Sequence, residues 1–332
     1  MLEDYKSLFK EVEFQDAIKA KRVCLFLGSG VGFNIGMPDW QGLATRITKF
    51  CLHQKIITRS EKLNLLSLNK PIKIISICTE KIKNKNKKQE FNNLLRELFY
   101  ETPRKNFKNS KIYNCLNKLY KEKAVLILQT NYDVMIEKFQ SEEEGLNRNF
   151  YIPYINMENP SQNNLLDSII YLHGRFSGDE KEKKKSSYEQ LVLSKEQYNR
   201  VYILENSDEY KRQKQFIKEL LKEFYIIFLG YSLSDEEILQ IIANKPNTEN
   251  FKQISVIVDN CEAKVLENEF NKNYLDIASN HKIKTYVYDT DSTGIEQSFE
   301  EVIENLTKTI LNLSKEKPAL IRYTNPEEVD FG

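Results

Sequence analysis

The stretch Arg22–Trp40 reads RVCLFLGSGVGFNIGMPDW and decides the fold of this chain. Its first six residues are mostly apolar and predict a short strand that is buried on both faces, as in a parallel sheet. The strand leads into Gly28, Ser29 and Gly30, a turn that lets the backbone approach a bulky anion closely. A helix that opens just after would add the positive end of its dipole. The stretch therefore predicts a unit of strand, glycine turn and helix; the alternative is an ordinary strand-to-helix turn without a ligand.

The composition is that of a globular protein with ample material for a core. The chain has 332 residues, 40% of them hydrophobic, with 18 tyrosines and 18 phenylalanines. Its 49 basic and 48 acidic residues nearly cancel, so no nucleic-acid or membrane-surface binding is expected. The five cysteines form no C-x-x-C pair, so neither a zinc knuckle nor a disulfide scaffold is predicted. Because the amino-terminal segment is charged and no apolar run reaches the length of a membrane span, we expect a soluble, cytoplasmic protein.

Buried strands alternate with helical patterns along the chain. This alternation predicts an α/β fold, a Rossmann-like doubly wound parallel sheet. We expect one domain over residues 1–332, with a core at about 16–50 and 122–314, an inserted small helical module at about 51–121 and an irregular tail at 315–332. The strands are expected at 22–27, 124–128, 150–155, 168–172, 225–229, 254–258 and 283–288.

Polar clusters follow the expected strands at the points where they end. In open parallel sheets, ligands bind beyond the carboxyl ends of the strands, at the point where the strand order reverses. The clusters lie at 28–32, 129–133, 173–174 and 230–235 and at Asp259. Their common placement predicts one large, nucleotide-sized site.

Three residues of these clusters are candidates for chemistry. Asn131 offers a donor and an acceptor for a sugar hydroxyl or a water, and Asp133 can accept from an amide. Both residue types also cap helices, so capping is the alternative for both. His173 ends an apolar strand and precedes a glycine, so we expect its ring to face the cleft and to serve as a general base. The alternative for His173 is a packed core histidine with one hydrogen bond.

Together these motifs resemble the sirtuin family. The first stretch is similar to the signature G-A-G-[IV]-S-x-x-x-G-I-P-D-[FW], with Gly28, Gly30, Gly36, Pro38 and Asp39 in register. The segment QTNYD at 129–133 resembles T-Q-N-I-D, His173-Gly174 resembles the family's His-Gly, and Gly230–Leu233 resembles its Gly-[TS]-Ser-Leu loop. The matches follow the family's order over about residues 20–290, and an accidental resemblance is improbable.

The departures from the sirtuin pattern indicate a particular branch. Sirtuin deacylases hold zinc on two C-x-x-C pairs, whereas residues 174–229 contain no cysteine, and their Phe-Gly-Glu segment is missing. Gln41 replaces an arginine, and Thr130 replaces a glutamine. The chain is more similar to the bacterial sirtuin-like effectors of antiphage defence. That resemblance implies hydrolysis of NAD+ to nicotinamide and ADP-ribose, NAD+ depletion, no zinc, and no cofactor beyond NAD+ as the substrate.

The resemblance also implies roles for individual residues. Asn131 would orient the nicotinamide ribose and the attacking water, Asp133 would hold the carboxamide, and His173 would accept a proton. The binding set would comprise Gly28, Ser29 and Gly30 at the pyrophosphate, Ser232 and Asp259 at the adenosine end, Asp39 and Trp40 over the nicotinamide pocket, and Thr130, Tyr132 and Gly230 beside them.

Two other functions remain open, and a partner is expected. The chain would otherwise be an NAD-dependent protein deacylase or ADP-ribosyltransferase, or a catalytically idle nucleotide-sensing or scaffold subunit. A free NAD+ hydrolase is toxic, and the sequence shows no obvious sensor domain. We therefore expect activation through a homo-oligomer or a separate protein, which in related systems is a HerA-type ATPase, an Argonaute-like protein or a nucleotide-processing enzyme. The helical module and the tail at 315–332 are the candidate contact surfaces.

Overall fold

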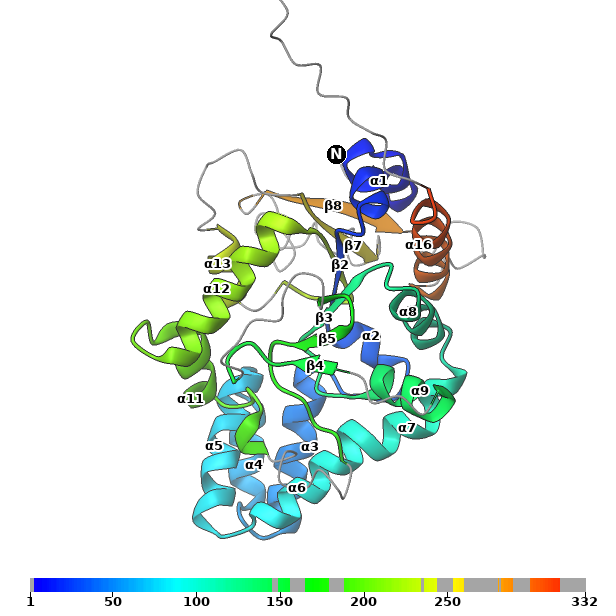
Figure 1. Ribbon diagram of the computed structural model, residues 1–332. Helices are drawn as coiled ribbons and strands as arrows, with labels where there is room; N and C mark the ends of the chain where they lie inside the picture. The colour runs from blue at the N-terminus through cyan, green and yellow to red at the C-terminus, as the bar shows by residue number, and fades with distance from the viewer. Residues whose placement is uncertain are drawn as a thin grey trace, which may run out of the picture.

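A single sheet of eight parallel strands forms the centre of the protein, in the order β1-β8-β7-β6-β2-β3-β5-β4. The computed structural model (Figure 1) describes residues 3–144, 149–155, 165–178, 188–233, 236–243, 253–259, 280, 282–288 and 299–316. The strands are β1 (Glu3–Asp4), β2 (Val23–Leu27), β3 (Leu126–Gln129), β4 (Asn149–Tyr151), β5 (Ser168–Tyr171), β6 (Tyr225–Leu229), β7 (Ile254–Asp259) and β8 (Ile283–Tyr288). The predicted Rossmann-like α/β fold is confirmed.

Strand β2 lies at the point where the strand order reverses. All five of its residues are buried, and it pairs with β3 on one side and β6 on the other. Leu27 is in register with both Gln129 and Leu229, so the three strands end level with one another. The loops that follow them therefore begin side by side, where a doubly wound sheet binds its ligand.

Helices cover both faces of the sheet, as Figure 1 shows, with α12 and α13 on one side and α8 and α16 on the other. The helices of the core are α1 (Val12–Lys19), α2 (Ser29–Phe33), α8 (Lys111–Lys121), α9 (Met135–Glu144), α12 (Asp208–Glu223), α13 (Glu236–Ala243) and α16 (Phe299–Leu313). Short 3-10 turns occupy η1 (Tyr5–Lys10), η3 (Phe107–Asn109) and η5 (Tyr188–Gln190). Helices on both faces bury the strands β2, β3, β5 and β6 completely, which explains their mostly apolar sequences.

A helical lobe lies beyond the carboxyl ends of the strands (Figure 1). It contains α3 (Trp40–His53), α4 (Arg59–Leu66), α5 (Pro71–Asn84), α6 (Lys88–Arg96), the π-helical turn η2 (Glu97–Glu101) and α7 (Thr102–Asn106). The apolar stripe of α3 packs against α5, whereas α8 packs against α16. By these contacts, α3 belongs with the lobe and α8 belongs with the core. The expected module at about 51–121 instead left most of α3 in the core and included α8.

The expected strands all form, with small differences in their bounds. Ala124 and Val125 precede β3, and residues 152–155 form a turn after β4. Strand β1, a two-residue pairing with β8, was not predicted because so short a strand has no detectable period. A short α-helix, α11 (Lys195–Tyr198), continues as the π-helical turn η6 (Asn199–Ile203).

Two remaining expectations concern the tail and the membrane. The tail falls outside the described residues from position 317 onward. Among the helices that the structure describes, none is both long enough and apolar enough to span a bilayer.

Candidate functional site

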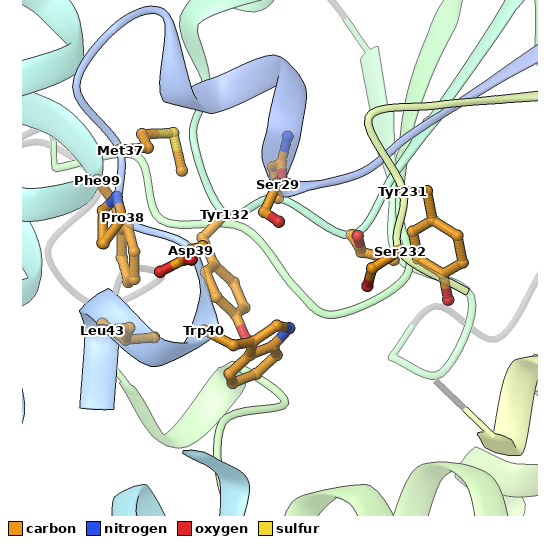
Figure 2. Close-up of a pocket in the computed structure, with 12 residues that line it drawn as sticks. Ser29, Met37, Pro38, Asp39, Trp40, Leu43, Phe99, Tyr132, Tyr231 and Ser232 are labelled. Atoms are coloured by element: carbon orange, nitrogen blue, oxygen red, sulfur yellow. The ribbon is translucent and has the colours of Figure 1, made fainter. Parts of the chain in front are cut away.

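The loops after β2, β3 and β6 meet in a pocket at the carboxyl edge of the sheet (Figure 2). Seven of the predicted site residues line it: Ser29, Asp39, Trp40, Thr130, Asn131, Tyr132 and Ser232. Five further lining residues, which were not among the predicted site residues, are Met37, Pro38, Leu43, Phe99 and Tyr231. Pro38 and Tyr231 lie within the sequence motifs, whereas Met37, Leu43 and Phe99 carry no signal, because apolar residues at such positions are indistinguishable from core residues.

Asn131 connects two of these loops. Its Nδ2 donates a hydrogen bond of 2.9 Å to the backbone oxygen of Gly28, and the residue is only 4% exposed. The side-chain oxygen Oδ1 has no hydrogen-bond partner among the described residues, and Asn131 borders the pocket. The amide is therefore fixed by its donor while its acceptor remains available to a hydroxyl group or a water.

The glycines of the first loop bring the backbones of two loops together. Gly28 N donates to Leu229 O at 3.0 Å, and Gly30 N donates to Gly230 O at 2.9 Å. A Cβ atom added to Gly28 would lie 2.4 Å from Gly230 O, and Gly230 itself has a φ of +57°. The expected phosphate cradle therefore needs correction, because the N–H groups of Gly28 and Gly30 are engaged within the protein. Among the three residues expected there, Ser29 is the one that borders the pocket.

His173 lies in an aromatic cage instead of facing the cleft. Its ring is fully buried. The centroid of this ring lies 5.2 Å from the ring centroid of Tyr198, 5.7 Å from that of Tyr202 and 6.5 Å from that of Trp40. The Tyr198 hydroxyl oxygen lies 3.4 Å from Nε2 and 3.5 Å from Nδ1. The expectation of an exposed ring was wrong, because aromatic residues some 25 positions downstream cover it.

Gly174 serves the turn after β5, not the exposure of His173. Its φ is +87°, and an added Cβ atom would lie 2.6 Å from both Gln190 O and Tyr154 Oη. The adjacent Val192 N donates to His173 O at 2.8 Å. The glycine therefore lets the chain at 190–192 pack directly over the histidine.

Trp40 forms the wall between the pocket and His173. It is the first residue of α3, whose start is capped by Asp39, which accepts from Gly42 N at 2.6 Å. The centroid of the indole lies 6.4 Å from the ring centroid of Tyr132 and 6.2 Å from that of Tyr198. Figure 2 shows it beside Tyr132, with the hydroxyl groups of Ser29 and Ser232 on the other side of the hollow.

Asp133 lies behind the pocket wall. Its Oδ1 accepts from Met135 N at 3.0 Å at the start of α9, and its Oδ2 accepts from the Tyr113 hydroxyl at 3.2 Å. Burial of the carboxyl group raises the pKa of Asp133 to about 6. This geometry is that of a helix cap, the alternative given above for Asp133. Both carboxylate oxygens accept hydrogen bonds within the protein, so neither is open to the expected contact with a nicotinamide carboxamide.

A buried ion pair supports the same region and was not predicted. Arg175 Nε and Nη2 donate to Glu137 Oε1 and Oε2 at 2.8 and 2.6 Å. The Tyr171 hydroxyl also donates to Glu137, and the Arg175 guanidinium lies 3.9 Å from the Phe150 ring centroid. This network fixes the segment that follows His173 to α9 and β4. Its only sequence signal is the arginine that directly follows the His-Gly pair.

The other predicted residues are placed as follows. Thr130 N and Oγ1 both donate to Leu27 O, and the Tyr132 hydroxyl donates to Val192 O at 2.9 Å. Ser232 is exposed at the pocket. Asp259 ends β7, opposite Tyr288, and its side chain falls outside the described residues.

The pocket is narrow in this conformation. Its cavity volume is about 30 Å³, room for about two or three water molecules. A dinucleotide needs more space, so we expect the surrounding loops to separate before it binds. Within the described ranges, no group of three or more His, Cys, Asp or Glu side chains is arranged to hold a metal ion.

Comparison with known families identifies the centre of the chain. Residues 125–278 match the model of the SIR2-like domain, a span that contains Asn131, His173 and the loop after β6. No curated protein gives a significant match. This match supports a sirtuin-like assignment and an NAD-related function for the matched region.

Proposed function

We propose that the protein is an NAD+ glycohydrolase that cleaves NAD+ to nicotinamide and ADP-ribose. The observation that carries this proposal is the geometry of Asn131. Its amide nitrogen is bound to Gly28 O and its amide oxygen is left to a pocket at the strand-order reversal of a SIR2-like domain. That oxygen is suited to accept a hydrogen bond from a ribose hydroxyl or from the attacking water.

The proposed reaction needs little acid assistance. Water attacks C1′ of the nicotinamide ribose, the C–N bond breaks, and its electron pair passes to the ring nitrogen, so nicotinamide leaves neutral. The protein has to stabilise an oxocarbenium-like state and to place the water. His173 would take the proton that the water loses, and a positioned base of this kind contributes roughly a hundred- to ten-thousandfold. For that step the Trp40 and Tyr198 rings have to move aside.

The remaining predicted residues take supporting roles in this proposal. Ser29 would bind the pyrophosphate, Ser232 and Asp259 the adenosine end, and Trp40 the nicotinamide. Asp133 would act as a positioning residue, because it ties the end of β3 to α9 instead of reaching the pocket. Asp39 would hold the start of α3, which carries Trp40.

The closed pocket supports a regulated effector. A cavity of about 30 Å³ and a fully buried His173 describe a resting state with little access for NAD+. We propose that assembly into a homo-oligomer or contact with a separate protein opens it, and that the outcome is NAD+ depletion in antiphage defence. The HerA-type, Argonaute-like and nucleotide-processing proteins remain the candidate partners.

Two other functions compete with this proposal. A deacylase or ADP-ribosyltransferase is less well supported, because residues 174–229 contain no zinc-binding cysteines and the Phe-Gly-Glu segment is missing. A nucleotide-binding subunit without catalysis is favoured by one observation, the burial of His173. NAD+ that is bound but not consumed would support this second function.

Incubation of the purified protein with NAD+ and chromatography of the products test the proposal. We expect nicotinamide and ADP-ribose from the wild type, and loss of both in Asn131→Ala and His173→Asn. The control is Asn64→Ala on the exposed surface of α4, which should retain full activity. Because a resting enzyme can be nearly silent, the assay is repeated with the operon partners co-purified. Product formation that requires an acetylated peptide would contradict the proposal in favour of deacylation.

A further inference from the structure

A second and much larger hollow lies between α5 and the segment 188–200. Its cavity volume is about 560 Å³. One wall is the face of α5 that carries Ser76, Glu80 and Lys83, and the other carries Ser194, Glu196 and Arg200. We call this hollow the α5–α11 cleft.

A hydrogen bond joins the two walls of the cleft, because Lys195 N donates to Ser76 Oγ at 2.8 Å. A second bond, from Tyr188 N to Asn92 Oδ1 at 3.1 Å, fixes the segment 188–200 to the neighbouring helix α6. The residues on α5 recur at three- and four-residue spacing, so they follow one helix face for about two turns, roughly 10 to 12 Å.

The charges that line the cleft are largely uncompensated. Glu80, Lys83 and Glu196 are exposed, and within the described ranges none of them forms an ion pair with another side chain. Arg200 makes a single long contact, from Nε to the Glu209 carboxylate at 3.6 Å. Each wall thus presents one acid and one base, separated by three or four residues along a helical segment.

This spacing fits an extended peptide. Side chains three or four apart on a helix have Cβ atoms about 5 to 6 Å apart. In an extended chain, side chains two apart point to the same side and lie about 6.6 Å apart. Small-molecule pockets are lined mainly by apolar residues, whereas each residue that lines this cleft carries a charged, hydroxyl or amide group. We infer that the α5–α11 cleft binds an extended peptide segment of mixed charge, with a basic and an acidic residue two positions apart.

The cleft shares one wall with the cage around His173. The segment formed by α11 and η6 carries Glu196 and Arg200 toward the cleft, and Tyr198 and Tyr202 against the His173 ring. Five of its residues are π-helical. This conformation is rare in proteins, and where it occurs it is often found at functional sites. A peptide that pairs with Glu196 and Arg200 therefore acts on the residues that cover His173. The binding inference stands by itself, whereas its consequence for catalysis rests on the proposed function.

Peptide titration of the full-length chain tests the binding. The probes are acetyl-Gly-Lys-Ser-Glu-Gly-amide and the uncharged acetyl-Gly-Gln-Ser-Gln-Gly-amide, followed by isothermal titration calorimetry. We expect the charged peptide to bind about fivefold more tightly, as two exposed ion pairs allow, and added salt to reduce this preference. Lys83→Gln removes one of the two charges on the α5 wall, and Glu196→Gln removes one of the two on the other wall. The variant of the wall that pairs with the peptide should reduce the preference to about twofold. The matched controls are Lys73→Gln, in the first turn of α5, and Glu205→Gln, both exposed and not among the residues that line the cleft. Equal affinity of the two peptides, no detectable binding of either, or equal effects of the control variants would overturn the inference.

Nuclear magnetic resonance of the histidines tests the coupling without any NAD+ turnover. The chain has only three histidines, so His173→Asn assigns the ring signals of His173. We expect the charged peptide to shift these signals in the wild type and to leave them unchanged in Glu196→Gln. Peptide binding without a shift at His173 would overturn the coupling. A shift in a protein that never cleaves NAD+ would uphold the coupling and contradict the proposed function alone.

Discussion

The closed pocket and the α5–α11 cleft lie on opposite sides of the segment 195–203 and differ in how they are built. The pocket side contains the ends of β2, β3 and β6, a buried carboxyl group and a buried ion pair. The cleft side is lined by exposed charges and holds about 560 Å³ of space, against about 30 Å³ in the pocket. We therefore expect the sheet side to stay fixed, and the lobe side with the segment 195–203 to move in the opening that we propose.

The difference is one of free energy as well as of space. Removing one partner of a buried ion pair leaves the other charge buried and uncompensated, at a cost of about 3–5 kcal/mol. An exposed pair contributes about 0–1 kcal/mol. Changes on the two sides of the segment should therefore differ severalfold in their effect on stability.

The largest effect is expected on the pocket side, at Arg175. Arg175→Met should lower the free energy of unfolding by about 3–5 kcal/mol, because Glu137 then remains buried without its bidentate partner. Urea unfolding followed by circular dichroism measures the change. The control is Arg59→Met, an exposed arginine on α4. Equal losses in the two variants would show that the pocket side is no more rigidly held than the lobe.

The next effect concerns the pH dependence of stability at Asp133. Its pKa is raised from 3.8 to about 6, so the folded protein binds a proton there between pH 4 and pH 6 that the unfolded chain releases. The contribution of Asp133 to the free energy of unfolding therefore falls as pH rises through this window, by about 3 kcal/mol for two pKa units.

Asp133→Asn should remove that part of the pH dependence while keeping an acceptor for Met135 N. Unfolding curves at pH 4, 5, 6 and 7 for the wild type and the variant give the difference directly. Asp16→Asn, on the exposed side of α1, is the control and should leave the profile as it is. A difference between wild type and Asp133→Asn that does not change with pH would mean that the carboxyl group is solvated, and the pocket side less closed than described.

A smaller effect is expected where the loops after β2 and β6 touch. Gly28→Ala places a Cβ atom 2.4 Å from Gly230 O, and such overpacking costs typically about 1–3 kcal/mol. Because the shift displaces the loop that holds the Asn131 amide, NAD+ consumption should be lost as well. The matched variant is Gly32→Ala, where the nearest atom is the flexible Met37 side chain at 3.0 Å. Equal tolerance of both substitutions would show that the two loops are free to separate.

Local patterns in the sequence predict the sheet and the place of the site. The strands 225–229 and 283–288 have the predicted bounds, because a buried strand reads as a continuous or alternating apolar run. The pocket falls where β2, β3 and β6 end, as the motif positions predict, because parallel strands carry their carboxyl ends to one edge.

What the sequence could not predict depends on contacts between distant segments. The glycines at 28 and 30 were read as a phosphate turn, but the same residue type is required by the close approach of Gly230. The burial of His173 comes from Tyr198 and Tyr202, whose spacing of four is that of any buried helix face. Neither contact can be recognised from a local sequence pattern, because each joins segments that meet only in the folded chain.

The smallest effect is expected at the edge of the cleft, at the exposed pair of Lys88 and Glu189. The Lys88 ammonium lies 2.8 Å from the Glu189 carboxylate, with about half of each side chain open to solvent. Such pairs contribute little in water, because solvent already stabilises both charges. Lys88→Gln should therefore leave the urea midpoint unchanged, in contrast to Arg175→Met. The same variant should weaken binding of the Lys-Ser-Glu peptide only slightly, because Lys88 already pairs with a carboxylate of the protein. Lys83 lines the cleft and has no ion-pair partner in the described part of the chain, so its charge is available to the peptide. A midpoint shift as large as that of Arg175→Met would mean that the cleft side is as firmly held as the sheet side, and the movable part of the molecule would then have to be sought elsewhere.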